Sequence, residues 1–274
     1  MKKIILLIVF ITGFCGNAQT SGPFISGCWQ TLSAGGAQTL AIKPNGELWG
    51  WGENGKGQLG DATNASNPIP KRLGNQNDWL KVSTNTDHTL AIKTDGTLWA
   101  WGDNLYGQLG DGSNVAKNIP VQIGTDTNWK DISAGLLHSI AIKTNGTIWS
   151  WGGNMFNQLG DGTSINRNTP VQVGTATDWD SINSNSSHTL AIKTDGTLWG
   201  WGGNGAGQLG DGTTSFRSTP VRIGTAADWL RVSTGGEFSV GIKTNGTLWT
   251  WGDNIIGQLG NGMTTDRLNP EQIG

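Results

Sequence analysis

The 274-residue sequence has few charged residues, few prolines and only two cysteines. Asp, Glu, Lys and Arg make up 14% of the chain, where about 25% is typical, so a disordered polyelectrolyte and a charged helical array are both excluded. Glycine and proline together stay below the roughly 25–30% of low-complexity chains, although 44 glycines are present. A formal net charge of −2 supplies no basic surface, so we expect no nucleic-acid binding.

Long hydrophobic runs are missing beyond the first residues. An apolar run of eleven residues, 4–14, follows two lysines, and the small residues Gly16 and Ala18 come next. This layout is typical of a secretory signal peptide, and the run is too short to cross a bilayer. We therefore expect residues 1–18 to be a signal peptide. The mature chain is expected to lack a transmembrane segment and to be secreted, periplasmic or at the cell surface.

The two cysteines bear on the same question. Cleavage after Ala18 would remove Cys15 and leave Cys28 as the one cysteine of the exported chain. No disulfide framework is therefore expected within it. The alternative to this cleavage is a lipid anchor at Cys15, but Phe14 stands where such a site needs a small residue.

Tryptophan, by contrast, is abundant, and its positions define an internal repeat. All fifteen Trp residues fall into five sets of three that recur every 50 residues without insertion or deletion. The sets are Trp29, Trp49 and Trp51; Trp79, Trp99 and Trp101; Trp129, Trp149 and Trp151; Trp179, Trp199 and Trp201; and Trp229, Trp249 and Trp251. We predict one domain over residues 29–274, after a lead-in over 19–28. Its repeats are 29–78, 79–128, 129–178, 179–228 and 229–274.

The third repeat predicts four strands and no helix. Strands are expected at 129–133, 138–143, 147–151 and 170–173, the last beginning with Pro170 because an edge strand tolerates a missing donor. Asn145-Gly146 predicts a type I′ turn between the second and third strands. Four strands in a unit of this length are typical of a β-propeller blade. The expected fold is all-β: a propeller of five 50-residue repeats, with four-stranded antiparallel blades, in a closed ring or an open arc.

The repeat also carries a family resemblance. Trp149-Ser150-Trp151-Gly152-Gly153-Asn154, then Gln158-Leu159-Gly160-Asp161-Gly162 and Pro170, resembles the repeat of the regulator of chromosome condensation family, here of a secreted bacterial type. The resemblance covers residues 29–274 and implies a propeller that serves as a protein-binding platform. The eukaryotic founder of the family acts on a nuclear GTPase and chromatin, roles that a secreted acidic protein does not fit. The family often has six or seven blades, so five blades imply a closed ring, an open arc or a fragment.

Candidate binding residues lie where the five copies differ most. The two residues after each Trp-Gly-x-Asn are Gly55-Lys56, Leu105-Tyr106, Met155-Phe156, Gly205-Ala206 and Ile255-Ile256. Large apolar side chains in a loop indicate a binding site, although they would also suit the cover of an adjacent blade. Phe216 and Arg217 lie in a second variable loop, where Lys117, Arg167 and Arg267 complete a basic column. The predicted partner-binding residues are Leu105, Tyr106, Met155, Phe156, Phe216, Arg217, Ile255 and Ile256.

Two polar columns have a structural and a functional interpretation. His88, His138 and His188 share one column and could ligate a metal, but Gln38 and Phe238 replace them in the outer copies, which favours structural hydrogen bonds. The aspartates that follow Gln-Leu-Gly lack the spacing of a calcium loop and favour loop capping; they are Asp61, Asp111, Asp161 and Asp211. No nucleophile and base stand together. We expect no catalytic residues, no metal and no cofactor.

These observations favour a secreted, non-enzymatic scaffold that binds a protein partner or a cell-surface component. Two alternatives remain: a propeller enzyme acting on carbohydrate, which requires convergent carboxylates in a cleft, and a repeat module of a larger cell-surface protein.

Overall fold

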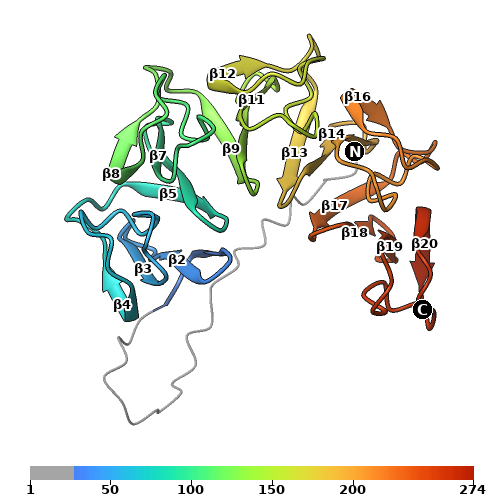
Figure 1. Cartoon of the computed structure of the whole chain (residues 1–274), viewed down its shortest axis with the longest axis horizontal. Helices are drawn as coiled ribbons and strands as arrows, with labels where there is room; N and C mark the ends of the chain where they lie inside the picture. The colour runs from blue at the N-terminus through green and yellow to red at the C-terminus, as the bar shows by residue number, and fades with distance from the viewer. Residues whose placement is uncertain (1–27) are drawn as a thin grey trace, which may run out of the picture.

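A computed structural model describes residues 28–274 of the chain. These residues form twenty strands in five four-stranded antiparallel sheets, each built from four consecutive strands in chain order. The sheets follow one another around a common centre, as the blades of a propeller do (Figure 1). Residues 28–274 contain no helix, and hence none that could cross a membrane. The all-β five-bladed propeller expected from the repeat is confirmed.

The strands recur at the repeat interval. The innermost strands are β1 (Thr31–Ala34), β5 (Trp79–Thr84), β9 (Trp129–Ala134), β13 (Trp179–Ser184) and β17 (Trp229–Thr234). The second strands are β2 (Gln38–Ile42), β6 (His88–Lys93), β10 (His138–Lys143), β14 (His188–Lys193) and β18 (Phe238–Lys243). The third are β3 (Leu48–Gly52), β7 (Leu98–Gly102), β11 (Ile148–Gly152), β15 (Leu198–Gly202) and β19 (Leu248–Gly252). The outermost are β4 (Asn67–Arg72), β8 (Lys117–Gln122), β12 (Arg167–Gln172), β16 (Arg217–Arg222) and β20 (Arg267–Ile273).

The turn between the second and third strands differs from the expected type I′. In the third repeat only Gly146 has a positive φ, of 74°, and Asn145 does not. The Gly146 N–H donates to the Lys143 carbonyl and the Lys143 N–H to the Thr147 carbonyl, which is a type I turn closed by a left-handed glycine. Asn145 acts through its side chain, which accepts the Thr147 N–H at 3.2 Å.

The outermost strand also begins earlier than expected. β12 starts at Arg167, opposite Gly152, and Pro170 is its fourth residue. A register shift between Ser150 and Gly152 makes room for the additional pairing. β12 pairs with β11 alone, so Pro170 is tolerated inside an edge strand as well as at its start.

The hydrophobic core lies between blades. The face of the second blade that is turned toward the third carries Leu90, Ile92 and Leu98. These side chains pack against Trp129 and Trp151 of the third blade. Trp151 is fully buried, and its indole N–H donates to the carbonyl of Gln108 in the blade before it at 2.9 Å. The equivalent bond is made by Trp101, Trp201 and Trp251. Each blade therefore needs a neighbour to bury its apolar faces, as expected of a repeat protein.

The five blades form an open arc, and the first and last blades lie apart (Figure 1). Their outward faces are uncovered. Leu248 and Ile242 of the last blade are each 39% exposed, whereas their equivalents in the other four blades are at most 3% exposed. Trp29 of the first blade is 37% exposed, against 3–5% for the same column in the other blades. Of the geometries left open by the sequence, the structure has the arc.

Two expectations concern the N-terminal segment. The signal peptide over 1–18, and the lead-in over 19–28 except for Cys28, lie outside the described residues. Cys28 is disulfide-bonded in the structure. This differs from the expectation of a single cysteine without a disulfide, which depended on cleavage after Ala18.

Candidate partner-binding face

The loops with predicted binding residues all leave the same side of the molecule. Because successive strands of a blade are antiparallel, the turn after the first strand and the loop after the third emerge together. We call this side the loop face. It consists of turns 35–37, 85–87, 135–137, 185–187 and 235–237 and of loops 53–66, 103–116, 153–166, 203–216 and 253–266.

A buried asparagine fixes each long loop. Asn154 is fully buried; its side-chain nitrogen donates to the Thr163 carbonyl at 2.9 Å, and its side-chain oxygen accepts the Leu159 N–H at 3.0 Å. The side chain of Gln158 accepts the Phe156 N–H at 2.8 Å. Asn and Gln hold these positions in all five repeats. The backbone beneath the variable pair is therefore held in place, which lowers the entropic cost of binding a partner there.

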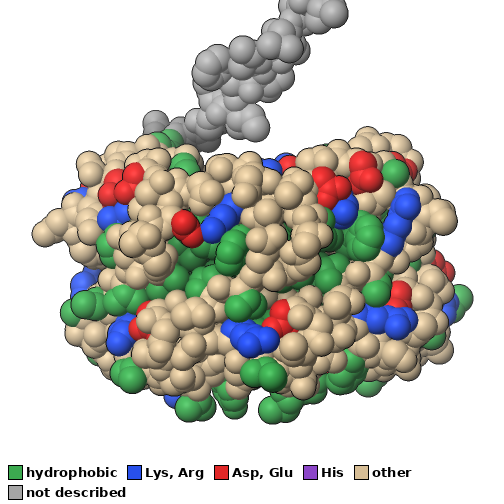
Figure 2. All heavy atoms as spheres, turned by 90° about the horizontal axis from the view of Figure 1, so that it is seen from above, with side chains coloured by type: hydrophobic (Ala, Val, Ile, Leu, Met, Phe, Trp, Pro, Cys, Tyr) green, Lys and Arg blue, Asp and Glu red, His purple; other side chains and the backbone are tan. Residues whose placement is uncertain are grey.

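The aspartate column caps the loops and forms ion pairs with three of the four residues of the basic column. Asp161 accepts the Thr163 N–H at 2.9 Å and pairs with Arg167 at 2.9 Å. Burial alone would raise the pKa of Asp161, but the hydrogen bonds from Thr163 and Arg167 hold it below its ordinary value. Arg217 likewise pairs with Asp211 at 2.6 Å. Figure 2 shows Lys or Arg side chains next to Asp or Glu side chains at several places on the side of the molecule in view.

The three histidines lie between blades and not on the loop face. All are fully buried, and the Nε2 of His88 lies 2.9 Å from the Ser139 hydroxyl of the next blade. That hydroxyl donates to the Gln108 carbonyl, so Nε2 carries the proton and donates to Ser139. Burial lowers the pKa of His88 to about 4 and that of His138 to about 3. The rings are therefore neutral, with the hydrogen-bonding role that the sequence favoured.

The predicted apolar residues of the loop face differ in exposure. The side chains that stand out most are Leu105, Met155, Ile255 and Ile256, which are 66%, 68%, 65% and 87% exposed. Figure 2 shows hydrophobic side chains protruding along the lower edge of the molecule. Tyr106 is half-buried and lines a recess with Arg167. Phe156 and Phe216 come from neighbouring blades, and their rings lie edge to face with 5.9 Å between the ring centroids.

The two phenylalanines belong to an apolar pocket between the third and fourth blades. The pocket has a volume of about 200 Å³, and Leu136 and Leu137 of the preceding turn complete its apolar wall. Gly203, Gly205 and Glu237 also line it, the last from the fifth blade. We call this cavity the Phe156–Phe216 pocket.

The sequence prediction included the two phenylalanines but missed the leucines. A signal was present: the equivalent turn pairs are Gly36-Ala37, Thr86-Asp87, Ser186-Ser187 and Gly236-Glu237. Leu136-Leu137 is the only pair in that column with two large apolar residues. Leu136 is 39% exposed although it is apolar, as expected of a binding surface.

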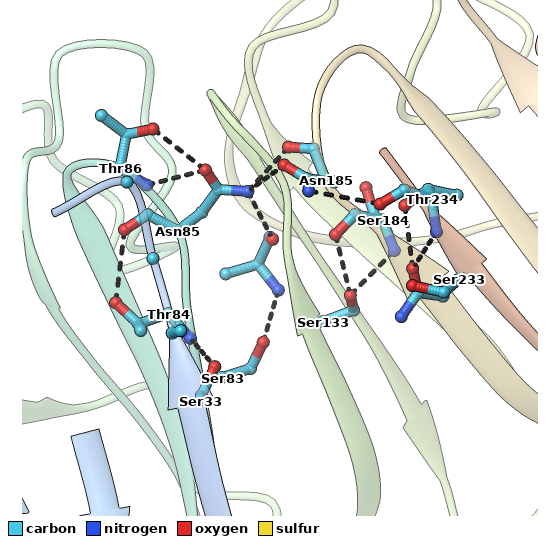
Figure 3. Close-up of a pocket in the computed structure, with 15 residues that line it drawn as sticks. Ser33, Ser83, Thr84, Asn85, Thr86, Ser133, Ser184, Asn185, Ser233 and Thr234 are labelled. Carbon is cyan, nitrogen blue, oxygen red and sulfur yellow. Dashed lines mark hydrogen bonds between the residues drawn. The ribbon is translucent and has the colours of Figure 1, made fainter. Parts of the chain in front are cut away.

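Another hollow lies at the centre of the loop face, where the inner strands converge. It has a volume of about 360 Å³, and its fifteen lining residues include no Asp, Glu, His, Lys or Arg. Its hydroxyls hold neighbouring blades together (Figure 3): Ser33, Ser83 and Ser133 each accept a backbone N–H of the next blade at 2.9 Å. This hollow supplies no carboxylate for the acid–base chemistry that a carbohydrate-cleaving enzyme requires.

The geometry defines a β-propeller whose repeats are joined by Trp-centred interfaces. A family model described as the RCC1-like domain matches residues 17–274, and the chain belongs to this family. A search among curated proteins found no match.

Solved structures share the fold. Human WBSCR16 is 22% identical to the chain with a TM-score of 0.81, over 91% of this chain and 67% of that one. Prp20p from Saccharomyces cerevisiae, in a structure described with its binding properties to Gsp1p and histones, is 19% identical with a TM-score of 0.69. That match covers 90% of this chain and 77% of Prp20p. Yeast RCC1 (Prp20) bound to Kap60 matches with a TM-score of 0.70 and 20% identity, over 90% of this chain and 75% of that one.

Proposed function

We propose that the protein is a secreted, non-enzymatic scaffold that binds a protein partner through the loop face. The observation that carries this proposal is the placement of large exposed side chains on loops whose backbone a buried Asn and a Gln hold by hydrogen bonds. Met155 and Ile256 are 68% and 87% exposed, and exposed apolar side chains gathered on one face mark an interaction site. Prp20p, of similar fold, is described as binding Gsp1p and histones, which supports protein recognition by this architecture. The apolar run at 4–14 supports export.

The test replaces three loop-face side chains, Tyr106→Ser, Phe156→Ser and Ile256→Ser, in the full chain. Wild type and variant are immobilised and incubated with extracellular fluid from the native source. Captured proteins are identified, purified and tested again for binding. We expect the variant to lose the partner that wild type retains, with an unchanged midpoint of thermal unfolding.

A matched control replaces exposed apolar residues outside the loop face, Leu80→Ser, Ile119→Ser and Leu230→Ser, which are 41%, 49% and 53% exposed. This control is expected to keep the partner. If the loop-face variant loses several kcal/mol of stability, those side chains belong to the core and the proposed site is wrong.

A further inference from the structure

The loop face brings two columns of the repeat side by side. The first residue of each long loop donates its N–H to the carbonyl of the last residue of the turn, for example Asp103 to Asp87 at 2.8 Å and Asp253 to Glu237 at 2.9 Å. In the second and fifth blades, both members of the pair are therefore carboxylates. In the third blade the pair is Leu137 and Gly153, and in the fourth it is Ser187 and Gly203. The acidic pairs of the second and fifth blades thus flank the uncharged pairs of the third and fourth blades.

The segments of the loop face are strongly acidic. They contain ten Asp and Glu residues and one basic residue, Lys56. Four of the ten are neutralised by strand residues; these are Asp61, Asp111, Asp161 and Asp211. Within residues 28–274, Asp87, Glu237 and Asp253 have no basic partner, and Asp103 reaches Lys56 only at 4.0 Å. Burial, followed by the nearby Asp103 carboxylate, raises the pKa of Asp87, so a cation placed there would relieve the repulsion.

Small residues line the Phe156–Phe216 pocket where other repeats carry larger ones. Gly203 and Gly205 line it, whereas the second repeat has Asp103 and Leu105 at the same positions. A Cβ at Gly205 would meet nothing within 4 Å. The fourth blade therefore has open space at the position where the second, third and fifth blades carry a large loop side chain.

We propose that the loop face recognises a basic peptide segment of its protein partner. One large apolar side chain of the segment enters the Phe156–Phe216 pocket, and flanking Lys or Arg side chains pair with Glu237 and Asp253 on one side and Asp87 and Asp103 on the other. This inference rests on the proposed function, because it specifies the partner of the same face. A buried apolar anchor between complementary charges gives both affinity and specificity.

The test uses three fluorescent peptides with the full chain: Lys-Lys-Phe-Lys-Lys, Lys-Lys-Ser-Lys-Lys and Glu-Glu-Phe-Glu-Glu. Binding is measured by fluorescence anisotropy at low ionic strength and again at about 0.5 M NaCl, where exposed charge pairs are screened. We expect the first peptide to bind about tenfold or more tightly than the second, since burying the anchor contributes that much. The acidic peptide is expected not to bind, and salt is expected to weaken the first.

Two glycine variants separate the pocket from the rest of the face. Gly205→Met introduces at the pocket the side chain found at Met155, and we expect about tenfold weaker binding of the Phe peptide. Gly55→Met makes the same change in the first blade, where the added Cβ meets only the Glu53 side chain at 3.2 Å, and is expected to leave binding unchanged. The double variant Asp87→Asn and Glu237→Gln is expected to reduce the dependence on salt.

Any of three results would overturn the inference. None of the three peptides binds, the acidic peptide binds as tightly as the basic Phe peptide, or Gly205→Met and Gly55→Met change binding of the Phe peptide equally. The proposed function is judged separately by the capture experiment. A captured partner that depends on Phe156 but competes with no basic peptide would leave the scaffold role intact and reject the basic-segment recognition. Failure of both experiments would reject both.

Discussion

Trp151 and Met155 are four residues apart, yet one is fully buried between two blades and the other is 68% exposed on the loop face. Trp occupies the first column in all five repeats, whereas the second column holds Gly, Leu, Met, Gly and Ile. A residue type is repeated where the next blade must fit against it. The copies are free to differ where no blade makes contact, so the differences between them mark the surface available to a partner.

The largest expected effect breaks a blade interface. Trp151→Ala is expected to lower the free energy of unfolding by about 3–5 kcal/mol, because it leaves a cavity and removes the bond to Gln108. Trp51 occupies the same column in the first blade but is only half-buried, so Trp51→Ala is expected to cost less. Met155→Ala is expected to change stability by less than about 0.5 kcal/mol. Urea unfolding measures all three, and equal costs at the two tryptophans would show that burial between blades is not the source of the stability.

The next effect depends on pH and on the buried histidines. The folded-state pKa of His138, about 3, lies below its ordinary value of 6.5, so the unfolded chain binds more protons between these values. Stability is therefore fully present above about pH 6.5 and falls as the pH is lowered, by about 1.4 kcal/mol per pH unit for each such histidine. Near pH 5, one such histidine therefore lowers the free energy of unfolding by roughly 2 kcal/mol relative to neutral pH.

The variant His138→Gln tests this pH dependence, since Gln38 occupies the same column in the first repeat. Urea unfolding at pH 7 and pH 5 is expected to show a smaller loss of stability for the variant than for wild type. An unchanged pH dependence would mean that His138 is not a neutral buried group.

The smallest effect belongs to the charged rim. Arg217→Ala removes the partner of Asp211 and is expected to cost about 1 kcal/mol or less, because the arginine side chain is 33% exposed. The pKa of Asp211 is expected to rise, as followed by NMR titration. Arg222→Ala is the control, since Arg222 contacts only the Thr225 carbonyl in the described hydrogen bonds. An equal loss in both variants would assign the effect to the side-chain stem and not to the ion pair.

The sequence predicted the scaffold well because each structural requirement recurs. The 138–143 strand, the glycine of the following turn and the hydrogen-bonding role of His138 all follow from columns seen several times. The predicted start of the fourth strand, Pro170, lies three residues after the observed start at Arg167. The additional pairing depends on a register shift near Gly152, and such a shift cannot be recognised in the residue pattern of a single strand.

The binding pocket was harder to predict because it is made by convergence and not by repetition. Phe156 and Phe216 were identified singly, but their contact depends on how the third and fourth blades are placed. Leu136 and Leu137 were missed because they lie in a turn that is otherwise small and polar. Glu237 lines the pocket from the fifth blade, a relation that sequence spacing alone does not specify.

The two ends of the arc expose residues that are buried between blades elsewhere in the molecule. Gly60, Gly110, Gly160 and Gly210 each lie against the indole of the next blade, whereas a Cβ at Gly260 would meet nothing within 4 Å. At the other end, the Trp29 face of the first blade has the same column of residues that the later blades bury. A further blade of this pattern would therefore meet, at either end, the same tryptophan and glycine positions that join the blades within the arc.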